Sequence, residues 1–232
     1  MKAELKLGDW RAYIDTLGEV DAMITDPPYG SRTHEGDIAA AVQQQSATGQ
    51  AVRRAIDYSA FTADDAAHLI NTMAPRVKGW MVVMTSHDLI PAYEQAMTEA
   101  GRYVFAPLAY VRKIPRLLGD GPASWMDYIV VSRPRSIDYS RWRCLPGAYI
   151  EERGMKERKP IIGGKPLWLM RALVRDYTNE GDTVIDPFAG GATTLIAARE
   201  FGRHSIGFEI DKAHYNIARD RIDAPAQADL WH

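Results

Sequence analysis

A short apolar strand that runs into an acidic residue and a glycine turn is the feature that most restricts the fold of this chain. The stretch DTVIDPFAGGATTLIAARE covers residues 182–200, with Asp186 as the last strand residue and a helix predicted from Thr193 to Phe201. A tight turn between a strand and a helix lets small residues and backbone N–H groups approach a nucleotide-like ligand. The stretch therefore predicts an α/β fold that binds such a ligand at the carboxyl end of this strand.

A second acidic residue supports the same kind of ligand. Glu209 ends the next apolar run, HSIGFE, and follows Asp186 by 23 positions. An acid at this distance can accept hydrogen bonds from both hydroxyls of a ribose. The turn DPFAGG lacks the GxGxxG spacing of dinucleotide-binding proteins, so we expect a nucleoside that carries something other than a diphosphate.

Short apolar runs alternate with helical periodicity along the rest of the chain, which is the pattern of an α/β sheet protein. YVFAPLAYV and DYIVVSR follow each other without a helix between them, so we expect an antiparallel pair at one sheet edge. The amino-terminal strand AELKL is expected to complete the sheet beside HSIGFE, with Asp9 near Glu209, in a circularly permuted order. The predicted strands are AELKL, AMIT, WMVVMTS, YVFAPLAYV, DYIVVSR, TVID and HSIGFE, and helices are predicted over Thr62–Arg76, His87–Ala100 and from Pro166 onwards.

The stretch AMITDPPYG, residues 22–30, ends another apolar run with a carboxylate, a rigid turn and an aromatic ring. Asp26 offers a carboxylate acceptor, and the carbonyl of Pro27 offers a second acceptor whose direction Pro28 fixes. Tyr29 offers a flat face on which a planar ring can stack. The stretch therefore places two hydrogen-bond acceptors and a stacking face together at the end of a predicted strand.

Four stretches, in this order, carry a family likeness: DPPYG, Lys165–Pro166, DPFAGGATT and GFEID. They resemble the beta group of S-adenosylmethionine-dependent amino methyltransferases that act on DNA. The resemblance covers nearly the whole chain apart from the residues after Gly30 and a basic segment. It implies a single methyltransferase domain over residues 1–232, with a Rossmann-like, mostly parallel seven-stranded sheet, an antiparallel edge pair and a circularly permuted motif order.

The resemblance implies methyl transfer from S-adenosylmethionine to the exocyclic N6 amino group of adenine in DNA, by base flipping and direct in-line transfer. The catalytic residues would be Asp26, Pro27, Pro28 and Tyr29. Adenine is expected because DPPY is commonest among adenine enzymes, and the N4 amino group of cytosine is the alternative. RNA and a protein amide are weaker options. From other classes, a non-catalytic regulator that binds S-adenosylmethionine and DNA stays open, as does a nicotinamide-dependent oxidoreductase.

The resemblance also implies the cofactor contacts. Glu209 resembles the ribose ligand, Asp9 the acid near the adenine amino group, and Lys165 the lysine of a segment that usually reads TxKP and reads GGKP here. A second departure is Ala192, which stands where a glycine is usual and narrows the space beside the ligand. The expected cofactor-binding residues are Asp9, Lys165, Asp186, Phe188, Ala189, Gly190, Thr193 and Glu209.

Positive charge is concentrated in one part of the chain. Residues 111–165 contain 12 Lys and Arg against 6 Asp and Glu, although the whole chain has a net charge of −2. A basic region on a mildly acidic body suits a polyanion such as DNA. We expect residues 132–164 to recognise the DNA target and residues 31–60 to form a mobile loop near the active site.

The remaining expectations concern the surroundings of the protein. No apolar run approaches the roughly 18 residues of a membrane span, and MKAELKLGDW lacks the apolar centre of a signal peptide. We therefore expect a cytoplasmic protein without membrane contact. Cys144 is the single cysteine, which excludes an internal disulfide and a multi-cysteine zinc site, and no metal site is predicted. A homodimer is expected from the resemblance alone.

Overall fold

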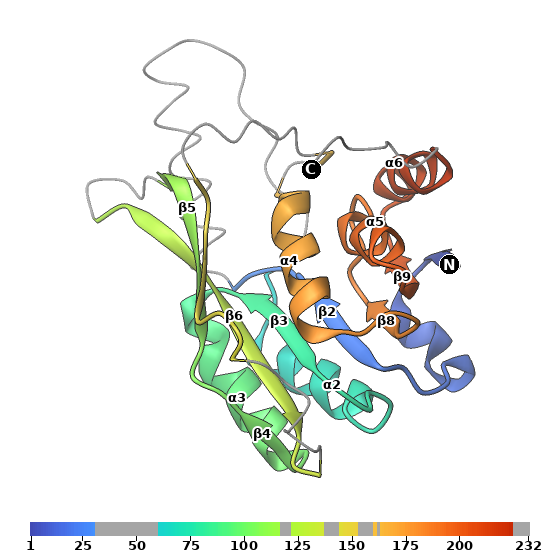
Figure 1. Cartoon of the computed structure of the whole chain (residues 1–232). Coiled ribbons are helices and arrows are strands. Elements are labelled where there is room, and N and C mark those ends of the chain that lie inside the picture. Colours follow the sequence, from blue (N-terminus) through green and yellow to red (C-terminus); the bar gives the residue numbers. More distant parts are fainter. Residues whose placement is uncertain (31–59, 117–121, 137–143, 153–159, 162, 225–232) are drawn as a thin grey trace. The chain divides into compact units, whose positions relative to one another are not determined.

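The computed structural model describes residues 1–30, 60–116, 122–136, 144–152, 160–161 and 163–224 (Figure 1). The chain forms two compact units. Unit 1 comprises residues 1–26 and 157–232, and unit 2 comprises residues 27–156. The boundary falls inside the DPPY stretch, directly after Asp26.

Unit 1 contains four parallel strands in the order β1-β9-β8-β2. Figure 1 shows β1 and β2 in blue beside β8 and β9 in orange and red, so both ends of the chain build one set of strands. Leu7 pairs with Glu209, which places β1 beside β9 and confirms the predicted circularly permuted order. The strands are β1 (Ala3–Leu7), β2 (Ala22–Thr25), β8 (Thr183–Asp186) and β9 (His204–Glu209).

Helices cover both faces of these parallel strands. Successive residues of a strand point to opposite faces, and in β9 Gly207 lies against Leu195 whereas the ring of Phe208 lies 5.4 Å from that of Tyr13. Leu195 belongs to α5 and Tyr13 to the 3-10 helix η1, so these two helices cover opposite faces. The helical elements of unit 1 are η1 (Trp10–Thr16), α4 (Leu167–Tyr177), α5 (Thr193–Glu200) and α6 (Lys212–Asp223).

Unit 2 is built around β6, which pairs antiparallel with β3, β4 and β5. The pairing of β5 with β6 confirms the predicted antiparallel pair, although β7 lies parallel along the other side of β5. The strands are β3 (Met81–Thr85), β4 (Arg102–Val104), β5 (Leu108–Arg116), β6 (Ser124–Pro134) and β7 (Ala148–Ile150). The helices are α2 (Ala63–Met73), the short 3-10 helix η2 (His87–Leu89) and α3 (Ile90–Glu99).

The described residues form nine strands where the sequence predicts seven. The predicted strand YVFAPLAYV divides into β4 and β5 around Pro107, because a proline cannot donate the N–H that a sheet ladder needs. The other added strand, β7, lies in the segment that the sequence predicts for DNA recognition. The helix predictions agree better with the structure than the strand predictions do. The buried residues of α2 are those that the spacing predicts, Ala66, Leu69, Ile70 and Met73.

No helix in the described part of the chain has both the length and the apolar character that crossing a membrane requires.

Candidate functional site

Acidic side chains gather at the carboxyl ends of the parallel strands of unit 1. Asp186 ends β8, Glu209 ends β9, and Asp26 directly follows β2. The fourth acid, Asp9, comes two residues after β1, and the N–H of the intervening Gly8 donates to the carbonyl of Glu209 over 2.8 Å. In parallel α/β sheets this edge is where ligands bind.

Asp186 is buried, and a second carboxylate lies near it. The hydroxyl of Thr25 donates to its Oδ1 over 2.7 Å, and the N–H of Phe188 donates to the same oxygen over 3.0 Å. Burial raises the pKa of Asp186 to about 6 despite these hydrogen bonds, and the negative charge of Asp26 acts in the same direction. A buried carboxylate at the start of this turn favours a ligand that brings positive charge.

The turn after β8 lets its backbone lie close to its neighbours. Gly190 has a φ of 51°, and a Cβ added to it would lie 3.0 Å from Cδ1 of Ile161. Ala192 also has a left-handed backbone, with φ 60° and ψ 28°, at the residue that precedes α5. Its methyl group packs in a cluster with Leu195 and Ala218. The turn thus presents main chain and small side chains rather than bulky groups.

Glu209 is 6% exposed, and its Oε1 accepts the N–H of Asp211 over 2.7 Å. Burial raises the pKa of Glu209, while the N–H groups of Asp211 and Gly190 lower it. The pair of oxygens at a strand end suits the hydroxyls of a sugar. Asp211 in turn begins α6, where its side chain accepts the N–H of His214 over 2.7 Å.

Two further residues predicted for cofactor binding lie at helix starts in unit 1. Asp9 is the N-cap of η1, where its carboxylate accepts the backbone N–H of Arg11 over 2.9 Å and its guanidinium over 3.0 Å. Thr193 is the first residue of α5, and its hydroxyl lies 3.4 Å from the guanidinium of Arg221.

Arg221 itself was not predicted from the sequence. Its guanidinium also donates to the carbonyl of Gly191, so it ties the end of α6 to the glycine turn. In the sequence it is one basic residue in a predicted helix, and no spacing links it to a turn thirty positions earlier.

Lys165 and Asp26, which the sequence assigns to different roles, lie together. The ammonium Nζ of Lys165 is 2.9 Å from Oδ1 of Asp26 and 3.0 Å from Oδ2. The Lys165 side chain is 7% exposed and that of Asp26 is 22% exposed. The pair is therefore a largely buried one, at the same strand edge as Asp186.

The rest of the DPPY stretch belongs to unit 2. Pro27 and Tyr29 are buried, and Pro28 is half-buried. The carbonyl of Tyr29 accepts the N–H of Phe61 over 3.1 Å, and the N–H of Gly30 donates to the hydroxyl of Ser86 over 3.2 Å. These hydrogen bonds fix the backbone of the turn on both sides of the tyrosine ring.

Both segments predicted near the site fall largely or partly outside the described residues. Of the predicted loop 31–60, the structure describes Ala60 alone. Of the predicted recognition segment 132–164, residues 137–143, 153–159 and 162 lie outside, and the described part contributes the end of β6 and all of β7.

Comparison with known proteins gives matches of two kinds. The model of a family described as DNA methylase matches residues 142–220. The type II methyltransferase M.HindIII of Haemophilus influenzae is 49% identical over 61 residues, which make up 26% of this chain and 20% of that protein. The chain therefore matches only a fifth of the length of this curated relative.

Solved structures match over the whole fold. The M1.HpyAVI–SAM complex has a TM-score of 0.69 at 21% identity and covers 96% of this chain and 100% of its own. The PvuII DNA methyltransferase, described as cytosine-N4-specific, has a TM-score of 0.67 at 13% identity and covers 97% of this chain and 88% of its own. At such identities the likeness shows the fold, a Rossmann-like α/β sheet. The family match and the curated relatives add that part of the chain, residues 142–220 in the family match, is similar to DNA methylases.

Proposed function

We propose that the protein transfers a methyl group from S-adenosylmethionine to the N6 amino group of adenine in DNA. The observation that carries this proposal is the position of Asp26. Its carboxylate directly follows β2, beside β8, whose end residue Asp186 opens the glycine turn. An acceptor for an amino group thus stands next to the turn at which a nucleoside cofactor is expected.

The residues of unit 1 fit S-adenosylmethionine. The buried carboxylate of Glu209 suits its ribose hydroxyls, and the small residues Ala189 and Gly190 leave the main chain open to its methionine part. Asp186 supplies negative charge for a ligand that carries an ammonium and a sulfonium group. When bound, the cofactor supplies an electrophilic methyl group. The likeness to M1.HpyAVI, whose structure contains SAM, supports the same assignment.

The protein's own groups would prepare the base. Asp26 and the carbonyl of Pro27 accept the two N–H hydrogens of the exocyclic amino group, which withdraws its lone pair from conjugation with the ring. Pro28 fixes the direction of that carbonyl, and Tyr29 provides the stacking face. The base has to leave the duplex to reach these groups. Proximity and orientation then supply much of the rate, and the carboxylate of Asp26 can take up the proton that the methylated nitrogen releases.

Adenine is proposed on the DPPY motif, and the carboxylate of Asp26 also suits the N4 amino group of cytosine. The PvuII enzyme, which is cytosine-N4-specific, shares the fold. The experiment that decides is incubation of the protein with labelled S-adenosylmethionine and unmodified DNA, followed by digestion and mass spectrometry of the nucleosides. We expect N6-methyladenine. N4-methylcytosine would instead establish the alternative target.

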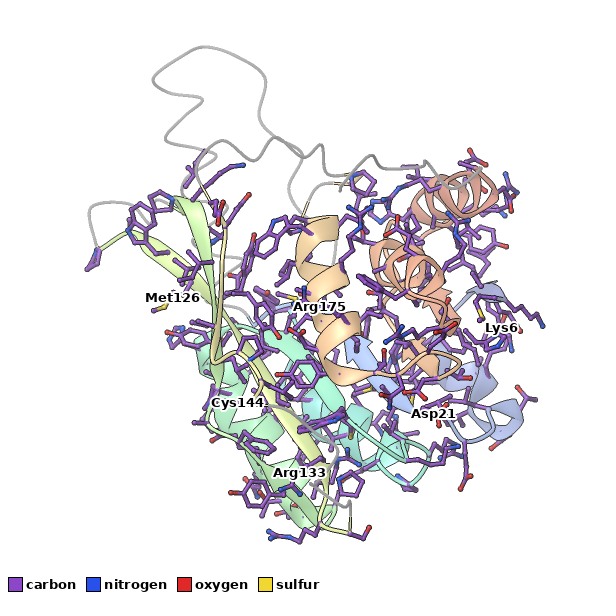
Figure 2. The ribbon with its side chains drawn as sticks, viewed as in Figure 1. Lys6, Asp21, Met126, Arg133, Cys144 and Arg175 are labelled. Atoms are coloured by element: carbon purple, nitrogen blue, oxygen red, sulfur yellow. The ribbon has the colours of Figure 1, made fainter. Side chains whose placement is uncertain are left out.

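Variants of two aspartates that flank β2 test the role of the site. We expect Asp26→Ala to lower methyl transfer about 100-fold or more. The matched control is Asp21→Asn, because Asp21 precedes the same strand at its opposite end, where it accepts the N–H of Thr183 over 2.8 Å (Figure 2). Full activity of Asp26→Ala would contradict the proposal.

Binding of S-adenosylmethionine by the wild-type protein without any methylated nucleoside would indicate a regulator. Binding of a nicotinamide dinucleotide in its place would indicate an oxidoreductase.

A further inference from the structure

The ion pair between Lys165 and Asp26 joins two parts of the chain that are 139 positions apart. Both carboxylate oxygens of Asp26 lie within 3.0 Å of the Lys165 ammonium. A buried ammonium is costly unless it is paired, so a lysine that is 7% exposed requires this carboxylate or another anion beside it. The ion pair is therefore part of the largely buried structure of unit 1 and not a contact on its surface.

The backbone around Lys165 holds its side chain toward this position. Gly163 has a φ of 81°, and the N–H of Gly164 donates to the carbonyl of Ile161 over 3.3 Å, so a tight turn precedes the lysine. Pro166 follows it as the N-cap of α4, and a residue before proline is restricted to extended conformations. Lys165 is thus fixed between a turn and a helix.

Two charged groups that face Asp26 act in opposite directions. Asp186, at the end of β8, repels a negative charge on Asp26, and the effect is mutual. Like charges in a buried site make it less favourable for both carboxylates to be ionised. Lys165, from the segment before α4, opposes this tendency, because a cation beside a carboxylate favours its ionised form.

We propose that Lys165 is a positioning residue for methyl transfer, whose ammonium keeps the carboxylate of Asp26 ionised and oriented toward the amino group of the target base. This inference rests on the proposed function. A carboxylate has about four acceptor positions, and one ammonium between its two oxygens occupies only part of them. Asp26 can therefore accept hydrogen bonds from the base while it stays paired with Lys165.

The pair can be tested without cofactor or DNA. In the full chain labelled with carbon-13, the carboxyl resonance of Asp26, assigned with Asp26→Asn, is followed as the pH changes. We expect Lys165→Met to move its titration midpoint up by about one pH unit or more, and Lys165→Arg to leave it near that of the wild type. The control is Arg171→Met, which removes a cation of α4 that lies 2.7 Å from Glu200. Equal midpoints in the wild type and Lys165→Met would overturn the inference.

The pH profile of kcat tests whether the pair matters for the reaction. With saturating S-adenosylmethionine and DNA, the acid limb of Lys165→Met should move to higher pH, so that at a fixed pH on this limb kcat falls about tenfold for each pH unit of movement. Calorimetry measures the Kd for S-adenosylmethionine in the same variants, so that a loss of cofactor affinity is distinguished from the loss of kcat that the inference predicts. Lys165→Gln removes the same charge and replaces the Met variant if thermal melting shows that the latter is unfolded.

The outcomes separate this inference from the proposed function. A wild-type pH profile in Lys165→Met and Lys165→Gln, together with an inactive Asp26→Ala, overturns the inference alone. The same holds if the uncharged variants lose affinity for S-adenosylmethionine and keep kcat, because Lys165 would then be only a cofactor ligand. A wild-type protein that methylates no DNA overturns both.

Discussion

Ala192 is, among the described residues, the non-glycine residue with a positive φ. A left-handed backbone costs an alanine about 1–2 kcal/mol relative to ordinary helical geometry. Its methyl group is fully buried beside Leu195, which offsets part of this cost. The family resemblance expects a glycine at this position, and the structure shows the backbone geometry that explains the expectation.

Substitutions at Ala192 should separate backbone strain from packing. We expect Ala192→Gly to change the free energy of unfolding by less than about 1 kcal/mol, because relief of strain is balanced by a lost methyl contact and a more flexible unfolded chain. Ala192→Val should lower it by more than about 2 kcal/mol, since a β-branched residue scarcely adopts this geometry. Urea unfolding measures both. A stable Val variant would mean that the backbone at this position is not left-handed.

Asp186 should make the stability of the protein depend on pH in an unusual direction. Its pKa rises from 3.8 to about 6, so between these values the folded protein binds a proton that the unfolded chain has released. Protonation of Asp186 therefore favours the folded state at low pH. This stabilisation is lost as the pH rises through about 6, and at pH 7 the group lowers the free energy of unfolding by roughly 3 kcal/mol relative to low pH.

Asp186→Asn removes this titration. We expect its free energy of unfolding, relative to that of the wild type, to increase steadily from pH 4 to pH 7, in urea unfolding series at each pH. The same variant should bind S-adenosylmethionine more weakly, because the proposed site loses a negative charge. A difference between variant and wild type that stays constant over this pH range would contradict the assignment of the raised pKa to Asp186.

At the scale of elements, the approach of α5 to β9 depends on Gly207. A Cβ added there would lie 2.8 Å from Cδ1 of Leu195 and 3.0 Å from Cβ of Ala189. We expect Gly207→Ala to lower the free energy of unfolding by about 1–3 kcal/mol, because overpacking moves the helix away from the strand. Gly18→Ala is the control, since nothing lies within 4 Å of its added Cβ. Equal melting temperatures for the two variants would show that α5 does not pack this closely.

The elements that follow from local sequence patterns are the ones that the sequence predicts well. The apolar stripe Ala66, Leu69, Ile70 and Met73 defines α2, and the acid after each apolar run marks the ends of β2, β8 and β9. The division of YVFAPLAYV and the short β7 are missed because both depend on which strand pairs with which, and a single proline or a run of three residues carries little of that information.

In the candidate site, too, the sequence predicts individual residues from local patterns but does not predict which distant residues pair with them. Motif spacing indicates Asp26, Asp186 and Glu209 because each ends a predicted strand. The hydrogen bond from Thr25 to Asp186 and the ion pair of Lys165 with Asp26 join residues 161 and 139 positions apart. The strand order brings Thr25 to Asp186, and the packing of the segment before α4 brings Lys165 to Asp26, so no local pattern could have identified these pairs.

At the scale of the whole molecule, charge is divided unevenly between regions of the chain. The basic segment 111–165 lies mostly in unit 2, which includes β5 and β6. On β5, Arg112 and Lys113 have acidic partners in Asp127 and Glu151. Part of the positive charge of the segment is therefore balanced within the protein itself.

Two further arginines of the segment lie near the end of β6, Arg133 within the strand and Arg135 after it. The guanidinium of Arg133, which Figure 2 labels, is buried and lies 4.7 Å from the centre of the Tyr103 ring. Arg135 lies just beyond β6 and is exposed. Because a phosphate contact requires an accessible cation, Arg135 is the better candidate of the two for a DNA contact.

This distribution leads to a prediction about DNA binding. If about four cations of the basic segment contact phosphates, affinity for DNA should fall roughly 100-fold between 50 and 200 mM salt. Arg135→Ala should reduce the slope of log affinity against log salt by about one, measured by fluorescence anisotropy with labelled duplex DNA.

Arg219→Ala removes an exposed cation of α6, outside the segment, and should leave the slope unchanged. Affinity for S-adenosylmethionine should change little with salt in all three proteins, because Asp186 and Glu209, which are proposed to bind it, are buried. A slope near zero for the wild type would contradict a role of residues 111–165 in binding a polyanion, whereas equal slopes for the two variants would move the contact away from Arg135.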